Sequence, residues 1–200
     1  MSSRALLFLC CAFFAVAVDG DVGTCRHQNP PPSWLTTTGH GLEGWATAGV
    51  PPTGPNFCLQ GSENKTRLEV DYHINLSRSV VLEQRRLNVS FVNQNACHNK
   101  DPRITYCVPF CAMPSLQAVA SLKALTSSDP KEVAEAIHAE LDKAKDWVVT
   151  VIKVNFRAVP QAHLDVQSFP DPSWCSVYIG IDTASDSYLF EIQIARILLS

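Results

Sequence analysis

Residues 68–77 read LEVDYHINLS, and this stretch decides the class of fold. Polar residues alternate with the apolar residues Leu68, Val70, Tyr72, Ile74 and Leu76. Strict alternation over this length predicts a β-strand with one buried face and one face in solvent. A strand of this kind is typical of antiparallel sheets, which commonly cover a core on one side only.

A second alternating run follows at residues 87–91, where Leu87, Val89 and Phe91 share one face. We expect this strand to pair antiparallel with the first through a connection between Ser77 and Arg86. The next segment, residues 97–111, contains proline and several cysteines. We expect it to form a disulfide-bound excursion from the sheet.

Two helices are predicted in the middle of the chain. Residues 114–125 (PSLQAVASLKAL) are good helix formers, although their apolar stripe is less regular. For the second helix, Asp129 suits the N-cap, Pro130 the first turn and Glu132 the third position of a capping box. A stripe at spacings of three and four extends this helix over residues 130–147 and consists of Val133, Ile137, Leu141, Ala144 and Val148.

Three further alternating runs, at residues 152–156, 177–181 and 190–194, predict strands that close the chain. The order of strands, helices and strands favours an α+β fold with a mostly antiparallel sheet, with one or two helices between the strand groups and with stabilising disulfides. A purely β sandwich, with the helices as an insertion, is the alternative. We expect the globular α+β domain to span residues 67–200.

Upstream of this domain, residues 21–66 have little periodicity and contain many prolines and glycines. They predict an irregular arm that Cys25 and Cys58 attach to the domain. Trp34 and Trp45 lie in this arm and are candidates for partner binding, because tryptophan is enriched in binding hot spots. The alternative is that both rings fold back to cover the sheet or the disulfides.

The first 20 residues have the parts of a secretory signal peptide. Arg4 precedes an apolar run over residues 5–18, which ends in Ala15-Val16-Ala17. We therefore expect residues 1–20 to be removed and the mature protein to be secreted and extracellular. A membrane-spanning helix needs about 20 apolar residues, so we expect no membrane span in the mature chain.

The cysteines that follow the predicted signal peptide also agree with secretion. An even number of cysteines follows the predicted signal peptide and implies disulfides of unknown connectivity: Cys25, Cys58, Cys97, Cys107, Cys111 and Cys175. Cys97-His98 with Cys107 and Cys111 could instead bind a metal, but no paired knuckle accompanies them, and we expect neither metal nor cofactor.

Three Asn-x-Ser/Thr sequons predict N-glycosylation at Asn64, Asn75 and Asn88. If the two strands near residues 68–76 and 87–91 share one core, Asn75 and Asn88 belong to the same outward face. A bulky, hydrated glycan disfavours a close protein interface on that face. The arm around the two tryptophans and the excursion at residues 97–111 are then the expected sites of partner contact.

Charge and motifs exclude several function classes. The net charge of −3, with 16 basic and 19 acidic residues, argues against a nucleic-acid partner. The chain contains no G-x-S-x-G or H-E-x-x-H motif and no unpaired cysteine among the six, so we expect it not to be an enzyme.

The favoured hypothesis is a secreted, N-glycosylated, disulfide-bonded protein that acts by extracellular recognition. It would serve as a signal, an adhesion protein or a coat component, with a protein or glycan partner. One alternative is a carrier that holds a small apolar ligand between sheet and helix. Another is a secreted hydrolase whose site forms only in three dimensions.

Overall fold

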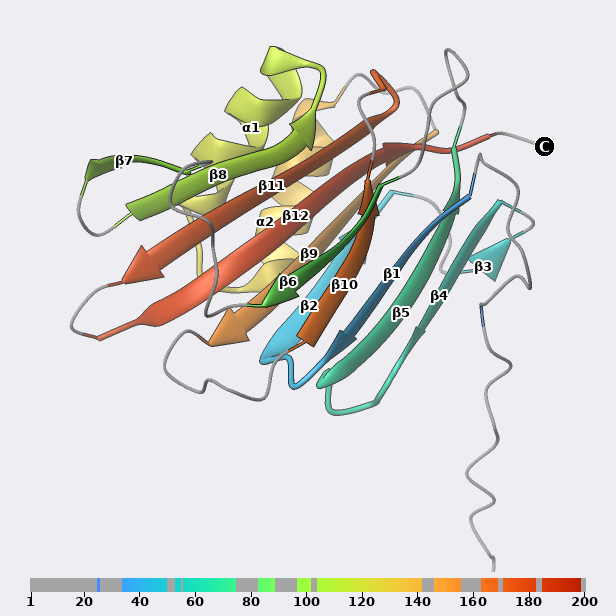
Figure 1. Cartoon of the computed structure of the whole chain (residues 1–200), viewed down its shortest axis with the longest axis horizontal. Helices are drawn as coiled ribbons and strands as arrows, with labels where there is room; N and C mark the ends of the chain where they lie inside the picture. Colours follow the sequence, from blue (N-terminus) through green and yellow to red (C-terminus); the bar gives the residue numbers. More distant parts are fainter. Residues whose placement is uncertain are drawn as a thin grey trace, which may run out of the picture.

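The computed structural model describes Cys25 and residues 34–49, 53–54, 56–74, 83–88, 97–101, 104–141, 146–155, 163–168, 171–182 and 185–198. The predicted signal peptide and Asn75 lie outside the described residues. The described residues form two helices and two six-stranded antiparallel sheets, which confirms the α+β prediction (Figure 1).

The first sheet, called here the outer sheet, has the strand order β3-β4-β5-β1-β10-β6. Its strands are β3 (Thr53–Gly54), β4 (Phe57–Gly61), β5 (Arg67–His73), β1 (Trp34–His40), β10 (His163–Ser168) and β6 (Glu83–Asn88). The second, called here the central sheet, has the order β2-β9-β12-β11-β8-β7. Its strands are β2 (Gly44–Ala48), β9 (Trp147–Asn155), β12 (Ser187–Arg196), β11 (Trp174–Asp182), β8 (Ile104–Cys111) and β7 (Cys97–Asp101).

The helices α1 (Pro114–Ala124) and α2 (Pro130–Glu140) lie along one face of the central sheet, and the outer sheet covers its other face (Figure 1). Two cores result. The core between the sheets includes Leu35, Val70, Tyr72, Ile152 and Trp174. The core between helices and central sheet includes Leu116, Val133, Ile137, Val177 and Phe190.

The central sheet therefore differs from the expectation of one solvated face. Strands β9, β11 and β12 are buried on both faces for most of their length. Several of their polar residues do not meet solvent, because the outer sheet covers them. Thr150, Ser176, Glu191 and Gln193 are all fully buried between the two sheets.

The expectation of an irregular arm is wrong for the described part of residues 34–61. Strand β1 lies between β5 and β10 in the middle of the outer sheet, and β2 pairs with β9 in the central sheet. Sequence periodicity missed β1 because its inward positions after Leu35 hold Thr37 and Gly39. Thr37 is buried and forms hydrogen bonds with Gln193. Gly39 has no side chain and leaves room for Leu42 and Leu164.

The predicted strand over residues 68–77 is confirmed over residues 68–73, which belong to β5, and residues 75–77 lie outside the described residues. Its predicted neighbour is wrong. Strand β5 pairs with β1 and β4, whereas β6 pairs with β10 at the other edge of the outer sheet. In a local hairpin β6 would pair with β5, but β1 occupies that position instead. Likewise, residues 97–111 are no excursion, because β7 and β8 form an edge hairpin of the central sheet.

The N-terminus of α2 is confirmed and its length is corrected. The side chain of Asp129 accepts a hydrogen bond from the backbone N–H of Lys131. The helix ends at Glu140, and Val148 belongs to β9 instead of the helical stripe. Residues 148–152 are all β-branched, which favours a strand over a continued helix at these positions.

Candidate functional site

The two candidate tryptophans are engaged inside the molecule. Trp34 is buried, and its ring stacks on the ring of His73 with 4.7 Å between centroids. Trp45 is half-buried; its Nε1 donates a hydrogen bond to the carbonyl of Arg67 at 3.0 Å, and the ammonium of Lys65 lies 3.7 Å from its ring centroid. The structure thus favours the alternative in which both rings cover the sheets.

Among the side chains that the structure describes, four of the six predicted cysteines form disulfides. One disulfide joins Cys25 to Cys58 on β4, and another joins Cys111 on β8 to Cys175 on β11. A disulfide removes both thiolates from metal binding, so Cys111 cannot complete the metal site considered from the sequence. Within the described residues, no group of three or more His, Cys, Asp or Glu side chains could hold a metal ion.

A polar cluster lies between the two sheets. The hydroxyl of Tyr72 lies 2.6 Å from Oγ1 of Thr150 and 2.9 Å from Oε1 of Gln193. Gln193 in turn donates to Oγ1 of Thr37 at 3.0 Å. These hydrogen bonds connect β5 and β1 of the outer sheet to β9 and β12 of the central sheet. Burial raises the pKa of Tyr72 well above its ordinary value, so its hydroxyl stays neutral and donates.

Glu191 extends this cluster along β12. Its Oε1 accepts hydrogen bonds from the hydroxyl of Ser176 at 2.7 Å and from Nε2 of Gln193 at 3.4 Å. Burial raises the pKa of Glu191 well above its ordinary value. Because these side chains have no contact with solvent, a substrate could reach them only by separating the sheets. We assign the cluster a structural role, which is to fix how the two sheets align.

The outer face of α1 is the most unusual part of the described surface. Among the residues whose burial is described, the exposed large apolar side chains are Leu122 and Leu125, with exposed fractions of 67% and 50%. Exposed Pro114 and Ala118 lie on the same side of the helix, at spacings of about one turn. We call Pro114, Ala118, Leu122 and Leu125 the α1 face.

Helix α1 is apolar on two opposite sides. Its buried side consists of Leu116, Ala120 and Ala124, which pack on the central sheet. The α1 face points the other way. A surface helix normally has a polar outer side, and apolar residues all round are typical of a helix that is covered. Helix α2 has such a polar side, where Lys131, Glu132 and Glu135 are exposed.

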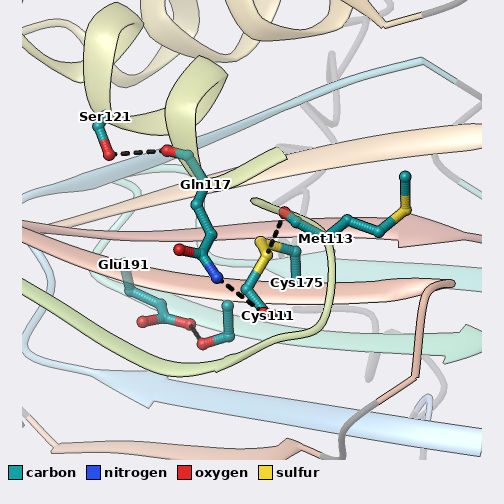
Figure 2. Close-up of a disulfide and its surroundings, with 7 residues drawn as sticks. Cys111, Met113, Gln117, Ser121, Cys175 and Glu191 are labelled. Carbon is teal, nitrogen blue, oxygen red and sulfur yellow. Dashed lines mark hydrogen bonds between the residues drawn. A yellow bond between two sulfur atoms is a disulfide. The ribbon is translucent and has the colours of Figure 1, made fainter. Parts of the chain in front are cut away.

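Local contacts hold α1 in place (Figure 2). The disulfide between Cys111 and Cys175 fixes the chain just before the helix, and Nε2 of Gln117 donates to the carbonyl of Cys111 at 2.7 Å. At the other end, the ammonium of Lys123 lies 2.7 Å from Oε1 of Glu140 on α2. The hydrogen bond and charge of Lys123 lower the pKa of the Glu140 carboxyl. The α1 face is therefore presented by a helix that is fastened at both ends.

Such an arrangement suits binding better than catalysis. The α1 face carries no titratable group, and the charge of Lys123 beside it is already paired. Apolar side chains in the centre of a surface, with charged groups at its edge, are typical of protein interfaces. A rigid surface also binds with a smaller loss of conformational entropy.

The sequence interpretation missed this face. The available signal was the less regular apolar stripe of residues 114–125, which results from apolar residues on both sides of the helix. From sequence alone, such a helix cannot be distinguished from one that is buried on all sides.

The family comparison covers nearly all of this fold. Residues 28–200 match the model of a family described as a family of unknown function (DUF5352). The chain belongs to this family. The DUF5352 match includes every described strand and helix, from β1 to β12, so residues 28–66 of the expected arm belong to the same family unit as the rest.

No curated protein and no solved structure matches the DUF5352 chain. Within the described residues, no helix is both long enough and apolar enough to span a membrane.

Proposed function

We propose that this DUF5352 protein is secreted and acts by recognition, with the α1 face as its contact surface for an extracellular protein. The disulfides support an oxidising compartment, since such bonds are rare in the cytosol. The single observation that supports the contact surface is the exposure of Leu122 and Leu125 on an otherwise well-packed domain.

Burial of the α1 face contributes to the energy of recognition. Full burial of a fully exposed leucine stabilises a complex by about 1.5–3 kcal/mol before the costs of association. Leu122 and Leu125 are exposed at 67% and 50%, so together they contribute about 2–3.5 kcal/mol. Two leucines with Ala118 and Pro114 beside them therefore form an apolar centre that a partner could cover. Single exposed apolar residues are common, but neighbouring ones on one rigid helix favour an interaction site.

The chemistry of the face favours a protein over a glycan partner. A sugar is bound mainly by hydrogen-bonding side chains, and the four residues of the α1 face have none. An apolar surface on another protein matches it better. The carrier alternative is less favoured, because the layer between the helices and the central sheet is filled by buried side chains of both.

The test compares two pairs of substitutions in the secreted protein. Leu122→Ser with Leu125→Ser removes the apolar centre of the α1 face. Glu135→Ser with Ala139→Ser changes two exposed positions of α2 and serves as the matched control. Each tagged protein is cross-linked to partners in the extracellular fluid of its source, and the captured partner is then purified for direct binding measurements.

We expect the leucine variant to bind the purified partner at least about tenfold more weakly, which corresponds to 1.4 kcal/mol. The control should bind like the unchanged protein. Equal binding by all three proteins would contradict the α1 face as the contact surface. Retention of the chain inside expressing cells, without export to the medium, would contradict the proposed secretion instead.

A further inference from the structure

The loop between β4 and β5 is held by its own hydrogen bonds. The backbone N–H of Ser62 donates to the carbonyl of Arg67, and the N–H of Lys65 donates to the carbonyl of Ser62. Ser62 also accepts a hydrogen bond at its hydroxyl from the N–H of Arg67 at 3.0 Å. These contacts lie within residues 62–67 and define the local shape of the loop.

The first sequon lies in this loop, at the lower end of β4 and β5 in Figure 1. Asn64 is exposed, as are its neighbours Glu63 and Lys65. Oδ1 of Asn64 accepts hydrogen bonds from the hydroxyl of Thr66 at 2.7 Å and from its backbone N–H at 3.3 Å. The sequon threonine therefore orients the carboxamide of Asn64 through its oxygen.

Trp45 holds the loop from the central sheet. Its Nε1 donates to the carbonyl of Arg67, and the ammonium of Lys65 lies over its ring. Gly61 contacts the ring so closely that a Cβ at this position would lie 2.2 Å from Cζ2 of Trp45. Trp45 thus touches the chain on both sides of Asn64, and the loop is fastened to both sheets.

We infer that Asn64 carries an N-linked glycan and that Trp45 is the positioning residue that keeps the glycan-bearing loop closed. This inference rests on the proposed secretion, because oligosaccharide transfer takes place in the secretory pathway. The donor is a lipid-pyrophosphate-linked oligosaccharide. Nδ2 of Asn64 forms a bond to the anomeric carbon of the sugar, the bond from that carbon to the pyrophosphate oxygen breaks, and Nδ2 loses one proton to the transferase.

The glycan has a protective role at this site. Lys65 and Arg67 are exposed and lie one and three residues after Asn64, so they are targets for trypsin-like proteases. A bulky, hydrated sugar beside them limits the access of a protease. The contacts of Trp45 add to this protection, since cleavage requires the loop to open.

The first experiment tests the glycan. The chain is expressed in glycosylating eukaryotic cells, once with its own residues 1–20 and once with a heterologous signal peptide in their place. Glycopeptide mass spectrometry should find most of Asn64 modified. Thr66→Val keeps Asn64 and the shape of the side chain but removes the hydroxyl, and it should abolish the modification. Thr66→Ser should retain it.

An unmodified Asn64 in protein exported by the heterologous signal would overturn the inference. If the protein is exported with the heterologous signal peptide but not with its own residues 1–20, this result would count against the proposed secretion of the natural chain. The glycosylation of Asn64 is still measured in that case, so the two failures can be told apart.

The second experiment tests Trp45, with the glycan first removed enzymatically from all samples. Trp45→Leu retains an apolar side chain but loses the hydrogen bond to Arg67 and the contact with Lys65. Trypsin should cleave after Lys65 about tenfold faster in this variant. Cleavage after Lys123, near the end of α1, is the internal control and should not change, because α1 packs on β8 and β11 and not on the strand that carries Trp45.

A general loss of folding would accelerate cleavage at both lysines, and circular dichroism identifies it independently. An unchanged rate after Lys65 in a folded Trp45→Leu protein would overturn the positioning role. Faster cleavage after Lys65 when the glycan is removed from the unchanged protein is expected from the protective role, and an equal rate would contradict that role.

Discussion

Glu191 is a fully buried carboxyl group in the layer between the two sheets. Ser176 and Gln193 donate to its Oε1, and within the described residues its Oε2 has no hydrogen-bond partner. A charged carboxylate in this position would be costly, because few groups replace its hydration. Burial accordingly raises the pKa of Glu191 well above its ordinary value, which favours the protonated form in the folded protein.

This burial predicts how stability depends on pH. Below the ordinary pKa of glutamate, near 4.3, Glu191 is protonated in both the folded and the unfolded chain. Its contribution to the free energy of unfolding is then fully present. As pH rises above that value, the unfolded chain loses the proton and the folded chain keeps it. The free energy of unfolding then falls by up to about 1.4 kcal/mol per pH unit, until the raised pKa of the folded state is reached.

Glu191→Gln should remove this loss, because glutamine does not titrate. We expect the free energy of unfolding of the variant, measured by urea denaturation between about pH 5 and pH 7, to fall less steeply than that of the unchanged protein. Glu63→Gln, at an exposed position of the loop between β4 and β5, is the control and should leave the slope unchanged. Identical slopes in all three proteins would show that Glu191 is ionised in the folded state.

At the scale of single elements, α2 illustrates how local signals and packing combine. Asp129 satisfies the N–H of Lys131, and the hydroxyl of Ser127 connects the N–H of Asp129 to the carboxylate of Glu132. The capping box predicted from the sequence is thus completed through Ser127. Further along the same helix, Ile137 is fully buried against the central sheet.

Two substitutions should separate these contributions. Asp129→Ala should lower the free energy of unfolding by about 0.5–2 kcal/mol, because first-turn N–H groups lose their acceptor. Ile137→Ala should lower it by about 2–5 kcal/mol, because it leaves a cavity in the core. Ala139→Ser, at an exposed position of the same helix, should change it by less than about 0.5 kcal/mol. Equal losses at all three positions in urea denaturation would contradict this assignment of α2.

For the whole molecule, the disulfides connect elements that are distant in sequence. The bond between Cys111 and Cys175 spans a sequence separation of 64 residues, and its two partners lie opposite each other on β8 and β11. The backbones of Cys97 and Cys107 are likewise opposite each other on β7 and β8. Neighbouring antiparallel strands place such Cα atoms about 4.5–5.5 Å apart, which is within the range of disulfides.

We therefore predict a third disulfide, between Cys97 and Cys107, in addition to the two described. Peptide mapping of the secreted protein under non-reducing conditions should find three linked pairs and no free thiol. Replacing Cys111 and Cys175 together by alanine should lower the free energy of unfolding by about 2–4 kcal/mol, because the unfolded chain gains freedom. A free thiol at Cys97 or Cys107 would contradict the third pair and reopen the question of their reactivity.

The sequence by itself determined the elements whose signals are local. The alternation of residues 68–74, the cap at Asp129 and the runs that became β9, β11 and β12 all depend on neighbours in the chain, and the structure contains each of them. The α+β class followed from their order. Of the candidate site residues, the sequence indicated the helix 114–125 but not its exposed face.

Only the tertiary structure decided which strands are neighbours and which surfaces are covered. Strand β1 separates β5 from β10, and the outer sheet buries Glu191 and Gln193 although their alternation predicted solvent. The same long-range packing buries Trp34 and leaves Leu122 exposed. The physical reason is that periodicity reports which side of an element a residue occupies, whereas the layer that covers this side comes from residues far away in the chain.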